Sequence, residues 1–372
     1  MAAQVTNYQC PACGGPLQFE ADGGKLGCEY CGSSFTVADV EALYADKDAQ
    51  AAQNLEEAEA VSEQTADGEW DASSLNDDWG ADADGMRAYN CPSCGAELLC
   101  DETTAATSCP YCANPTIVPG KLSGMLKPDF VIPFKIKKEE AVKALKKHYE
   151  GKKLLPNSFK DSNHLEEIKG VYVPFWLFDG EAEGKISYAA TRSRTYRSGD
   201  YEVTETRHFN VHREGSVHFE RIPVDASSKM PDDYMDSIEP FKYEDLTAFS
   251  TAYLPGYMAD KYDITVDACS PRADLRAGNT VAECIRSTVH GYDLVMERGK
   301  HINVHRGEVK YALLPVWLLS TKWQGKTYLF AMNGQTGKLV GDLPVDKGKA
   351  WLRFGIAYAI SALVTAAAVL FL

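Results

Sequence analysis

The feature that most constrains this chain is a cysteine pattern that occurs twice, at an offset of 81 residues. Each copy reads C-x2-C-x14-C-x2-C, a spacing in which two short turns supply four thiolates to one tetrahedral Zn²⁺. The first quartet is Cys10, Cys13, Cys28 and Cys31, and the second is Cys91, Cys94, Cys109 and Cys112. The pattern predicts two zinc ribbons, at 1–37 and 89–118, each too small to fold without its metal.

The metal in such a site is structural, because four protein ligands leave no coordination position for water. Iron in a rubredoxin-like centre fits the same spacing and stays open as the alternative. The sequence contains no H-E-x-x-H, no G-x-S-x-G and no Gly-rich dinucleotide-binding pattern. We therefore predict a protein that is not an enzyme, with no catalytic residue and with two structural Zn²⁺ ions.

The acidic residues of the chain are concentrated before residue 120, where 21 acidic residues face 3 basic ones. Between the ribbons, residues 38–88 predict a short helix followed by a flexible acidic linker. Trp70 and Trp79 stand out in this linker. We expect them either to act as docking anchors for a partner or to fold back onto a ribbon. The N-terminus lacks a secretory signal, so we expect it in the cytoplasm, where cysteines remain reduced.

Residues 119–349 predict one α+β domain. KKEEAVKALKKHYEG, at 137–151, has the apolar spacing of a helix, and residues 280–289 predict a second helix. The segment 201–224 alternates like a pair of strands around a turn at Glu214 and Gly215, and another turn is expected at Asn333 and Gly334.

A second repeat relates VYVPFWLFDGEAEGKISY, at 171–188, to ALLPVWLLSTKWQGKTYL, at 312–329. Both copies have Pro and Trp two residues apart, and both have Gly-Lys near their ends. Each copy predicts a strand, a turn and a returning strand, so we expect two related β-hairpins in one sheet system.

The last 19 residues, 354–372, contain no charge and would be about 28 Å long as a helix. That length matches the hydrocarbon core of a bilayer, so this segment predicts a transmembrane helix. Lys347, Lys349 and Arg353 precede it, and positive residues flanking a span stay on the cytoplasmic side. The expected location is the inner membrane, single-pass, with the N-terminal bulk in the cytoplasm. A buried C-terminal core helix is the alternative.

Weaker patterns favour structural interpretations. His208, His212, His218, His301 and His305 fit a solvated surface better than a metal site. Gly325-Lys326-Thr327 lacks the earlier glycine of a phosphate-binding loop. Residues 135–153 hold eight lysines, which indicates either contact with an anionic leaflet or an ordinary solvated face.

Charge argues against nucleic acid as the partner of the ribbons. Residues 8–37 have one Lys against three acidic residues, and residues 89–118 have three acidic residues without Lys or Arg. Phosphate binding requires positive charge, so these surfaces favour a protein partner. A tethered nucleic-acid binder remains the alternative function, to be distinguished by a steep salt dependence.

The two C-P-x-C-G ribbons, the V-P-F-W strand at 173–176, YLPGYMADKYD at 253–263 and the hydrophobic C-terminus give a family resemblance. The chain resembles bacterial membrane-anchored TFIIB-type zinc ribbon-containing proteins, which are sometimes labelled primosomal-helicase-like. The helicase label does not suit this sequence, which has no intact phosphate-binding loop. The resemblance implies a link to flotillin-like (SPFH) and phage-shock scaffolds.

Together these observations predict an α+β protein with two N-terminal zinc ribbons, a β-rich domain and one C-terminal transmembrane helix. The expected function is that of a membrane-anchored adaptor that recruits protein partners, among them an SPFH scaffold, at the inner membrane. Self-association into a homo-oligomer is left open.

Overall fold

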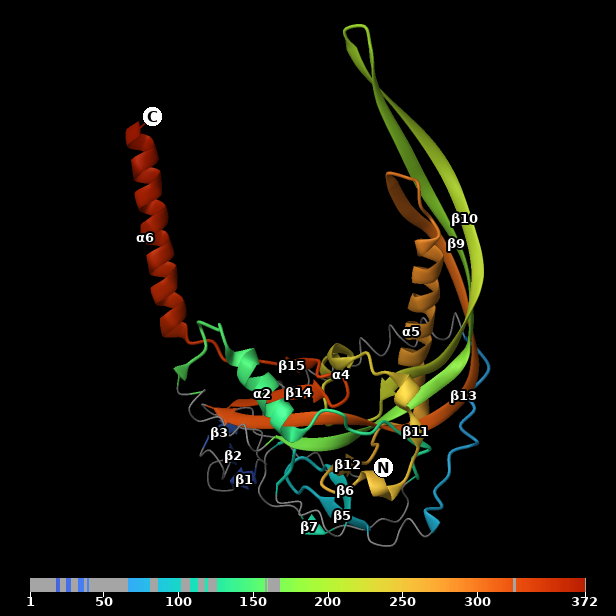
Figure 1. The fold of residues 1–372 in the computed structure, drawn as a ribbon, viewed down its shortest axis with the longest axis vertical. Coiled ribbons are helices and arrows are strands. Elements are labelled where there is room, and N and C mark those ends of the chain that lie inside the picture. Colours follow the sequence, from blue (N-terminus) through green and yellow to red (C-terminus); the bar gives the residue numbers. More distant parts are fainter. Residues whose placement is uncertain are drawn as a thin grey trace.

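The computed structural model describes residues 18–20, 25–27, 33–36, 39, 66–80, 86–101, 108–112, 118–119, 126–157, 159, 168–323 and 326–371. Within these residues the chain is strand-rich, and its largest sheet curls into a half-barrel (Figure 1). The described segments include four α-helices: α2 (Lys138–Tyr149), α4 (Asp232–Ile238), α5 (Val266–Ser287) and α6 (Lys347–Phe371). The predicted α+β fold ending in a transmembrane helix is therefore wrong, since one curled sheet organises the described chain.

The described strands form two sheets. The small sheet holds β1 (Gln18–Glu20), β2 (Lys25–Gly27) and β3 (Ser34–Thr36), all antiparallel. The main path of the large sheet runs β11 (Thr247–Ala248), β8 (Phe130–Val131), β13 (Leu294–Trp323), β9 (Lys169–Ser198), β12 (Met258–Asp260), β6 (Glu97–Asp101), β5 (Met86–Asn90), β7 (Val118–Pro119). Off this path, β10 (Tyr201–Asp225) pairs with β9, β4 (Ala66–Asp67) and β14 (Lys326–Asn333) pair with β13, and β15 (Leu339–Gly341) pairs with β14. Two short 3-10 turns, η3 (Tyr243–Asp245) and η4 (Thr251–Tyr253), precede β12.

The two related segments of the sequence lie side by side on β9 and β13, which are antiparallel neighbours. Tyr172 faces Pro315, and Pro174 faces Leu313. The run VYVPFWLF, at 171–178, is buried on both faces of the sheet, because alternate residues enter two different apolar clusters. We call the base the part of the fold that packs around this run in those two apolar clusters.

Only the second of the two related segments forms a hairpin, between β13 and β14. The first continues as one strand through Gly180 and Gly184, where the prediction placed a turn. A Cβ atom at Gly184 would lie 2.6 Å from Ile285 and 2.7 Å from Val281, both on α5. A Cβ atom at Gly180 would lie 2.6 Å from the backbone oxygen of His305. These glycines therefore admit close neighbours instead of turning the chain.

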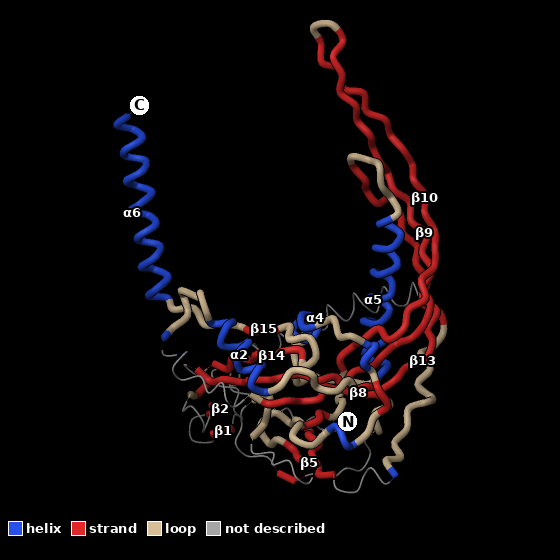
Figure 2. Tube along the Cα trace, in the orientation of Figure 1, coloured by secondary structure: helices blue, strands red, loops and turns tan. Residues whose placement is uncertain are grey.

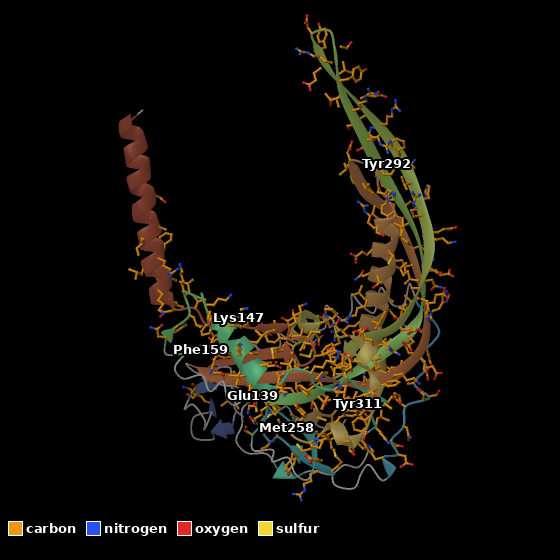
Figure 3. The ribbon with its side chains drawn as sticks, viewed as in Figure 1. Glu139, Lys147, Phe159, Met258, Tyr292 and Tyr311 are labelled. Carbon is orange, nitrogen blue, oxygen red and sulfur yellow. The ribbon has the colours of Figure 1, made fainter. Side chains whose placement is uncertain are left out.

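β9 and β10 form a long hairpin that rises from the base (Figure 2). β10 pairs with β9 from Tyr201 to Phe219 without a register shift, so the turn predicted at Glu214 and Gly215 is wrong. We define the arm as residues 191–210, the end of this hairpin where side chains on both faces are mostly exposed. Figure 3 contrasts Tyr311, inside the packed base, with Tyr292, at the level of the arm.

Two β-bulges mark the level at which the hairpin leaves the base. β10 has one extra residue between Phe219 and Ile222, where Arg221 adopts a φ of 62°. β13 has one extra residue between Arg306 and Val309. Phe219 and Arg306 both face Gly180 on β9, so the two bulges flank the same point of the central strand. Bulges bend a strand and increase its twist, which accounts for the curl of the sheet here.

α5 packs on the concave side of the curled sheet (Figure 1). The sequence predicted only its end, at 280–289, because Pro271 inside the helix interrupts a helical pattern. Val281, Ile285 and Cys269 are buried, whereas Cys284, which the apolar spacing of 280–289 places on the buried face of the predicted helix, is exposed.

The helix predicted at 137–151 is confirmed as α2. Its buried face carries Val142, Leu145 and Tyr149, which join an apolar cluster with Phe159 and Phe330. Its lysines Lys138, Lys143, Lys146 and Lys147 are not buried. The turn expected after β14 is also present, since the Gly337 amide donates to the Asn333 carbonyl at 2.9 Å.

Residues 66–80 pack along the base and do not form a flexible linker. β4 pairs with β13, and the Asp71 amide donates to the Gly307 carbonyl at 2.9 Å. Trp70 and Trp79 are both 8% exposed, and the Trp70 ring meets Phe178 edge-on with 4.7 Å between centroids. The tryptophans thus fold back, but onto the sheet and not onto a ribbon.

The C-terminal apolar stretch belongs to α6, whose first turns carry Lys347, Lys349 and Arg353. A membrane span requires about 20 consecutive apolar residues. Over the described ranges, no helix meets the length and apolarity needed for crossing a bilayer. This finding overturns the transmembrane helix predicted at 354–372 and the single-pass inner-membrane location.

Candidate metal centre

The first half of the candidate site is the turn between β5 and β6, which carries Cys91 and Cys94. The Cys91 amide donates to the Ala96 carbonyl and the Gly95 amide donates to the Cys91 carbonyl, each at 2.8 Å. Gly95 has a φ of 70°, a conformation that glycine adopts without a steric penalty. The turn therefore points two sulfur atoms to the same side, as the C-P-x-C-G sequence predicted.

The second half lies at 108–112 and carries Cys109 and Cys112. The segment is fixed from β9, where the Lys169 ammonium donates to the Ser108 carbonyl at 2.6 Å. It is also fixed from β12, where the Asp260 carboxylate accepts a hydrogen bond of 2.7 Å from the Tyr111 hydroxyl. Two strands of the large sheet thus hold this half in place.

The sulfur atoms of Cys91, Cys94, Cys109 and Cys112, here called the four-thiol cluster, all lie within 4.8 Å of one another. The Cys91–Cys112 and Cys94–Cys109 sulfur separations are 3.7 and 3.6 Å. A tetrahedron with metal–sulfur bonds of about 2.3 Å has edges of roughly 3.8 Å. A disulfide would need about 2.05 Å, so these are separate thiols. The cluster could hold a metal ion.

The cluster is largely shielded from water. Cys91 and Cys109 are each 1% exposed and Cys112 is 8% exposed. Hydrogen bonds among the thiols shift their pKa values in opposite directions. The hydrogen bond with Cys109 lowers the pKa of Cys91 and lowers that of Cys112 to about 7, but it raises that of Cys94. Four adjacent thiolates repel one another, and a bound cation removes this repulsion.

The first quartet, Cys10, Cys13, Cys28 and Cys31, lies outside the described residues. Cys100 is fully buried and stands apart from the four-thiol cluster, and burial raises the pKa of its thiol to about 12. It is therefore a core residue.

Sequence reasoning missed the polar residues that support the cluster. Asp260 is 1% exposed and accepts hydrogen bonds from Tyr111 and, at 2.6 Å, from the Ser227 hydroxyl. Burial raises the pKa of the Asp260 carboxyl to about 7. Tyr111 has a counterpart in Tyr30 of the first ribbon sequence, and that match was a signal that the tyrosine has a role. Asp260 carried no comparable signal.

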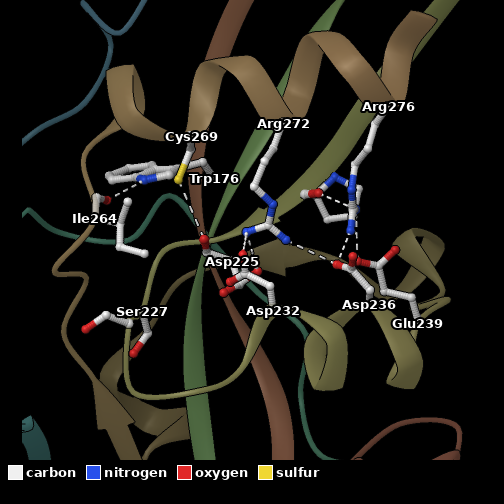
Figure 4. A network of polar contacts seen from close by, with 12 residues as sticks. Trp176, Asp225, Ser227, Asp232, Asp236, Glu239, Ile264, Cys269, Arg272 and Arg276 are labelled. Carbon is white, nitrogen blue, oxygen red and sulfur yellow. Dashed lines mark hydrogen bonds and ion pairs between the residues drawn. The ribbon is translucent and has the colours of Figure 1, made fainter. Parts of the chain in front are cut away.

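A second polar network ties α5 to α4 and to the end of β10 (Figure 4). Arg272 contacts Asp225 at 3.0 Å and Asp236 at 3.2 Å, and Arg276 contacts Glu239 at 3.0 Å. Burial raises the pKa of Asp225 to about 6, although Arg272 opposes that rise. Every carboxylate here is paired with an arginine, so the network serves to fasten the elements together.

The histidines considered as metal ligands lie on β10 and β13. His208, His212, His218 and His301 are exposed, and His305 is half-buried. An open hollow of about 530 Å³ on this surface is lined in part by His212, His301 and Lys185. Within the described chain, none of these histidines joins a group of three or more metal-ligating side chains.

The fold and the site define a strand-rich protein in which a cluster of four cysteines, built into the large sheet, could hold a metal ion. The chain is 38% identical over 360 residues to the uncharacterized protein YdjG of Bacillus subtilis (strain 168), and the match covers 95% of this chain and 94% of YdjG. The chain therefore belongs to the YdjG family. No family model matches the sequence, and no solved structure matches it.

Proposed function

We propose that this protein is a non-enzymatic adaptor. Its four-thiol cluster holds Zn²⁺ as a structural ion, and the part of the base that carries this cluster binds a protein partner. The observation that carries the proposal is the sulfur geometry, because separations of 3.6 and 3.7 Å match the edges of a closed tetrahedral site. A site closed by four protein ligands stabilises a surface and leaves no position for a reacting molecule.

The expected consequence of metal binding is an ordered edge of the sheet. β6 pairs with β12, and β12 pairs in parallel with β9, so the cluster is two strands away from the central strand. The apolar cluster around Cys91, Cys109 and Cys112 also contains Phe175 and Leu177 of β9. A metal at this site would therefore secure the surface presented by β5, β6 and β7.

The proposed composition is two Zn²⁺ ions per chain, because the first quartet repeats the spacing of the second. Tetrahedral sulfur sites also accept iron, and metal analysis distinguishes the two ions.

The charge of the ribbon sequences supports a protein partner. Residues 89–118 contain three acidic residues and neither Lys nor Arg, which disfavours a phosphate backbone. The resemblance to TFIIB-type zinc ribbon proteins makes an SPFH scaffold the first partner to test.

The test is affinity capture with the full chain after nuclease treatment, comparing wild type with the Cys91→Ser/Cys94→Ser variant. The proposal predicts that wild type recovers a protein partner and that the variant loses both one metal equivalent and the partner. Cys284→Ser is the matched control, because Cys284 is exposed and lies outside the cluster.

Recovery unchanged in the double variant would reject a role of the cluster in binding. Recovery that depends on nucleic acid and falls steeply with salt would instead favour the nucleic-acid-binding alternative. The Cys10→Ser/Cys13→Ser variant tests the first quartet in the same way.

A further inference from the structure

β10 is a long edge strand. From Tyr201 to Phe219 it pairs with β9 in one uninterrupted register, and none of the other described strands pairs with it. An edge strand presents backbone N–H and C=O groups along its free side, and these groups can pair with another chain. Residues 201–217 alone would extend over roughly 58 Å.

This edge lacks several of the devices that usually prevent such pairing. Natural edges are kept short, bulged, covered, or interrupted by Pro and by charged side chains, above all Lys. β10 has 25 residues, and its segment 201–222 contains neither Pro nor Lys. Its only register shift comes at the base, between Phe219 and Ile222. The long part that leaves the base is therefore open to a further strand.

The sequence of this edge is complementary to itself in an antiparallel register centred on Phe209. Antiparallel pairing about a two-fold axis through a residue keeps facing side chains on the same side of the sheet. With the axis at Phe209, Glu205 of each copy faces Arg213 of the other, and the ring of Phe209 faces its own copy. Such opposite-charge and aromatic pairs stabilise neighbouring strands.

The neighbouring register is unfavourable. Moving the axis by one residue, to Asn210, places Arg207 of each copy opposite Arg213 of the other, and like charges directly opposite destabilise a sheet. The register centred on Phe209 has no like-charged facing pair between residues 201 and 217. The register centred on Phe209 also pairs the free edge from residue 201, just after the hairpin turn, to residue 217, and so it ends before the bulge.

The side chains needed for this pairing are available. Arg213 is exposed, and its guanidinium donates a hydrogen bond of 2.9 Å to the neighbouring His212 carbonyl. Glu205 is exposed and contacts Arg207 on its own strand at 2.8 Å. α5 packs on the concave face of the sheet and ends near the middle of this edge, where Arg286 lies over the ring of Tyr188, the partner of Val211 on β10. The part of the edge above Val211 is therefore clear of the helix.

We infer that a second copy of this chain adds to the sheet at the β10 edge, antiparallel and about a two-fold axis at Phe209. The result is a symmetric dimer with one sheet continuing through both arms. This inference does not depend on the four-thiol cluster or on the proposed adaptor function.

The test is the molar mass of the full chain by light scattering over a range of concentrations. Wild type should be a dimer. Glu205→Arg and Arg213→Glu should each place like charges opposite one another twice, weakening the dimer by about ten-fold or more. The combined Glu205→Arg/Arg213→Glu variant should restore it, because both pairs are again opposite in sign.

Glu202→Arg is the matched control, since it reverses a charge on the same strand but faces the neutral Ser216 in this register. It should remain a dimer, and circular dichroism should show that every variant folds. A monomeric wild type, or single variants that dimerise like wild type, would overturn the inference. Failure of the combined variant to restore the dimer would overturn the register.

Discussion

The base and the arm are parts of the same strand, yet they are built differently. Along 171–178, β9 is buried on both faces, whereas along 191–198 it is mostly exposed on both. Trp176 and Phe178 are at most 1% exposed, but Tyr196 is 44% exposed and Tyr201 is 77% exposed. Backbone pairing is present in both regions, with bulges on β10 and β13 between them. Pairing alone therefore does not imply equal stabilisation by burial.

Stability and interaction reside in different parts of this molecule. Burial of apolar side chains is the main source of folding free energy, so the base should determine global stability. An isolated two-stranded ribbon is at best marginally stable, and the arm depends on the base for its order. Substitutions in the two regions should differ accordingly.

The largest effect should come from removing metal with a chelator. A structural zinc site contributes on the order of 10 kcal/mol to the element that it holds. Amide hydrogen exchange should accelerate at 86–101 and at β12, with little change within the arm. Equal acceleration in the base and in the arm would show that the metal stabilises the whole sheet. Unchanged exchange rates in the base would show that the cluster carries no structural metal.

The next effect should come from truncating an aromatic residue in the base. Phe178→Ala should lower the free energy of unfolding by about 3–5 kcal/mol, because the ring is fully buried and packs on Trp70. The matched Tyr196→Ala substitution in the arm should change the free energy of unfolding by no more than about 0.5 kcal/mol. Urea denaturation measures both, and similar losses would contradict the division between base and arm.

The pH dependence of the base should follow Asp260. Its pKa is raised by burial to about 7 in the folded state, so the folded state retains a proton that the unfolded chain releases near pH 4. Stability should therefore fall as pH rises from about 4 to about 7, by roughly 4 kcal/mol at most. Asp260→Asn should lack this loss, and parallel pH profiles of the two proteins would disprove the assignment.

The smallest effect concerns two glycines that face each other across β9 and β10. Gly184→Ala should cost about 1–3 kcal/mol, since its Cβ would meet Ile285 and Val281. Gly215→Ala is the control, because no atom lies within 4 Å of a Cβ atom there. Thermal unfolding should show a lower midpoint for Gly184→Ala than for Gly215→Ala. Equal destabilisation of the two variants would show that the contact with α5 does not restrict the side chain at position 184.

Much of the local structure could be predicted from the sequence. The apolar spacing at 137–151 identified α2, and the cysteine spacing identified the four residues that meet in the cluster. The internal similarity between 171–188 and 312–329 identified the two strands at the centre of the sheet. In each case the signal is carried by residues close together in the chain.

The errors arise where a distant contact decides the structure. Gly180 and Gly184 suggested a turn, but His305 and the side chains of α5 explain them. Trp70 looked like part of a flexible linker, but its ring packs against Phe178, which lies more than 100 residues later in the sequence. The contacts that decide these two positions are not encoded within a short window of sequence. The membrane span was instead predicted from the uncharged length of 354–372 and the positive residues before it, a pattern that does not by itself make a helix long and apolar enough to cross a bilayer.

The paired bulges beside Gly180 give the hairpin the mechanics of a lever. From Gly180 to the turn after Ser198, β9 extends over roughly 60 Å. A change of only about 10° in the bend at this joint would sweep the tip through roughly 10 Å. One inserted residue on each flanking strand thus sets the direction in which the far end of the molecule points.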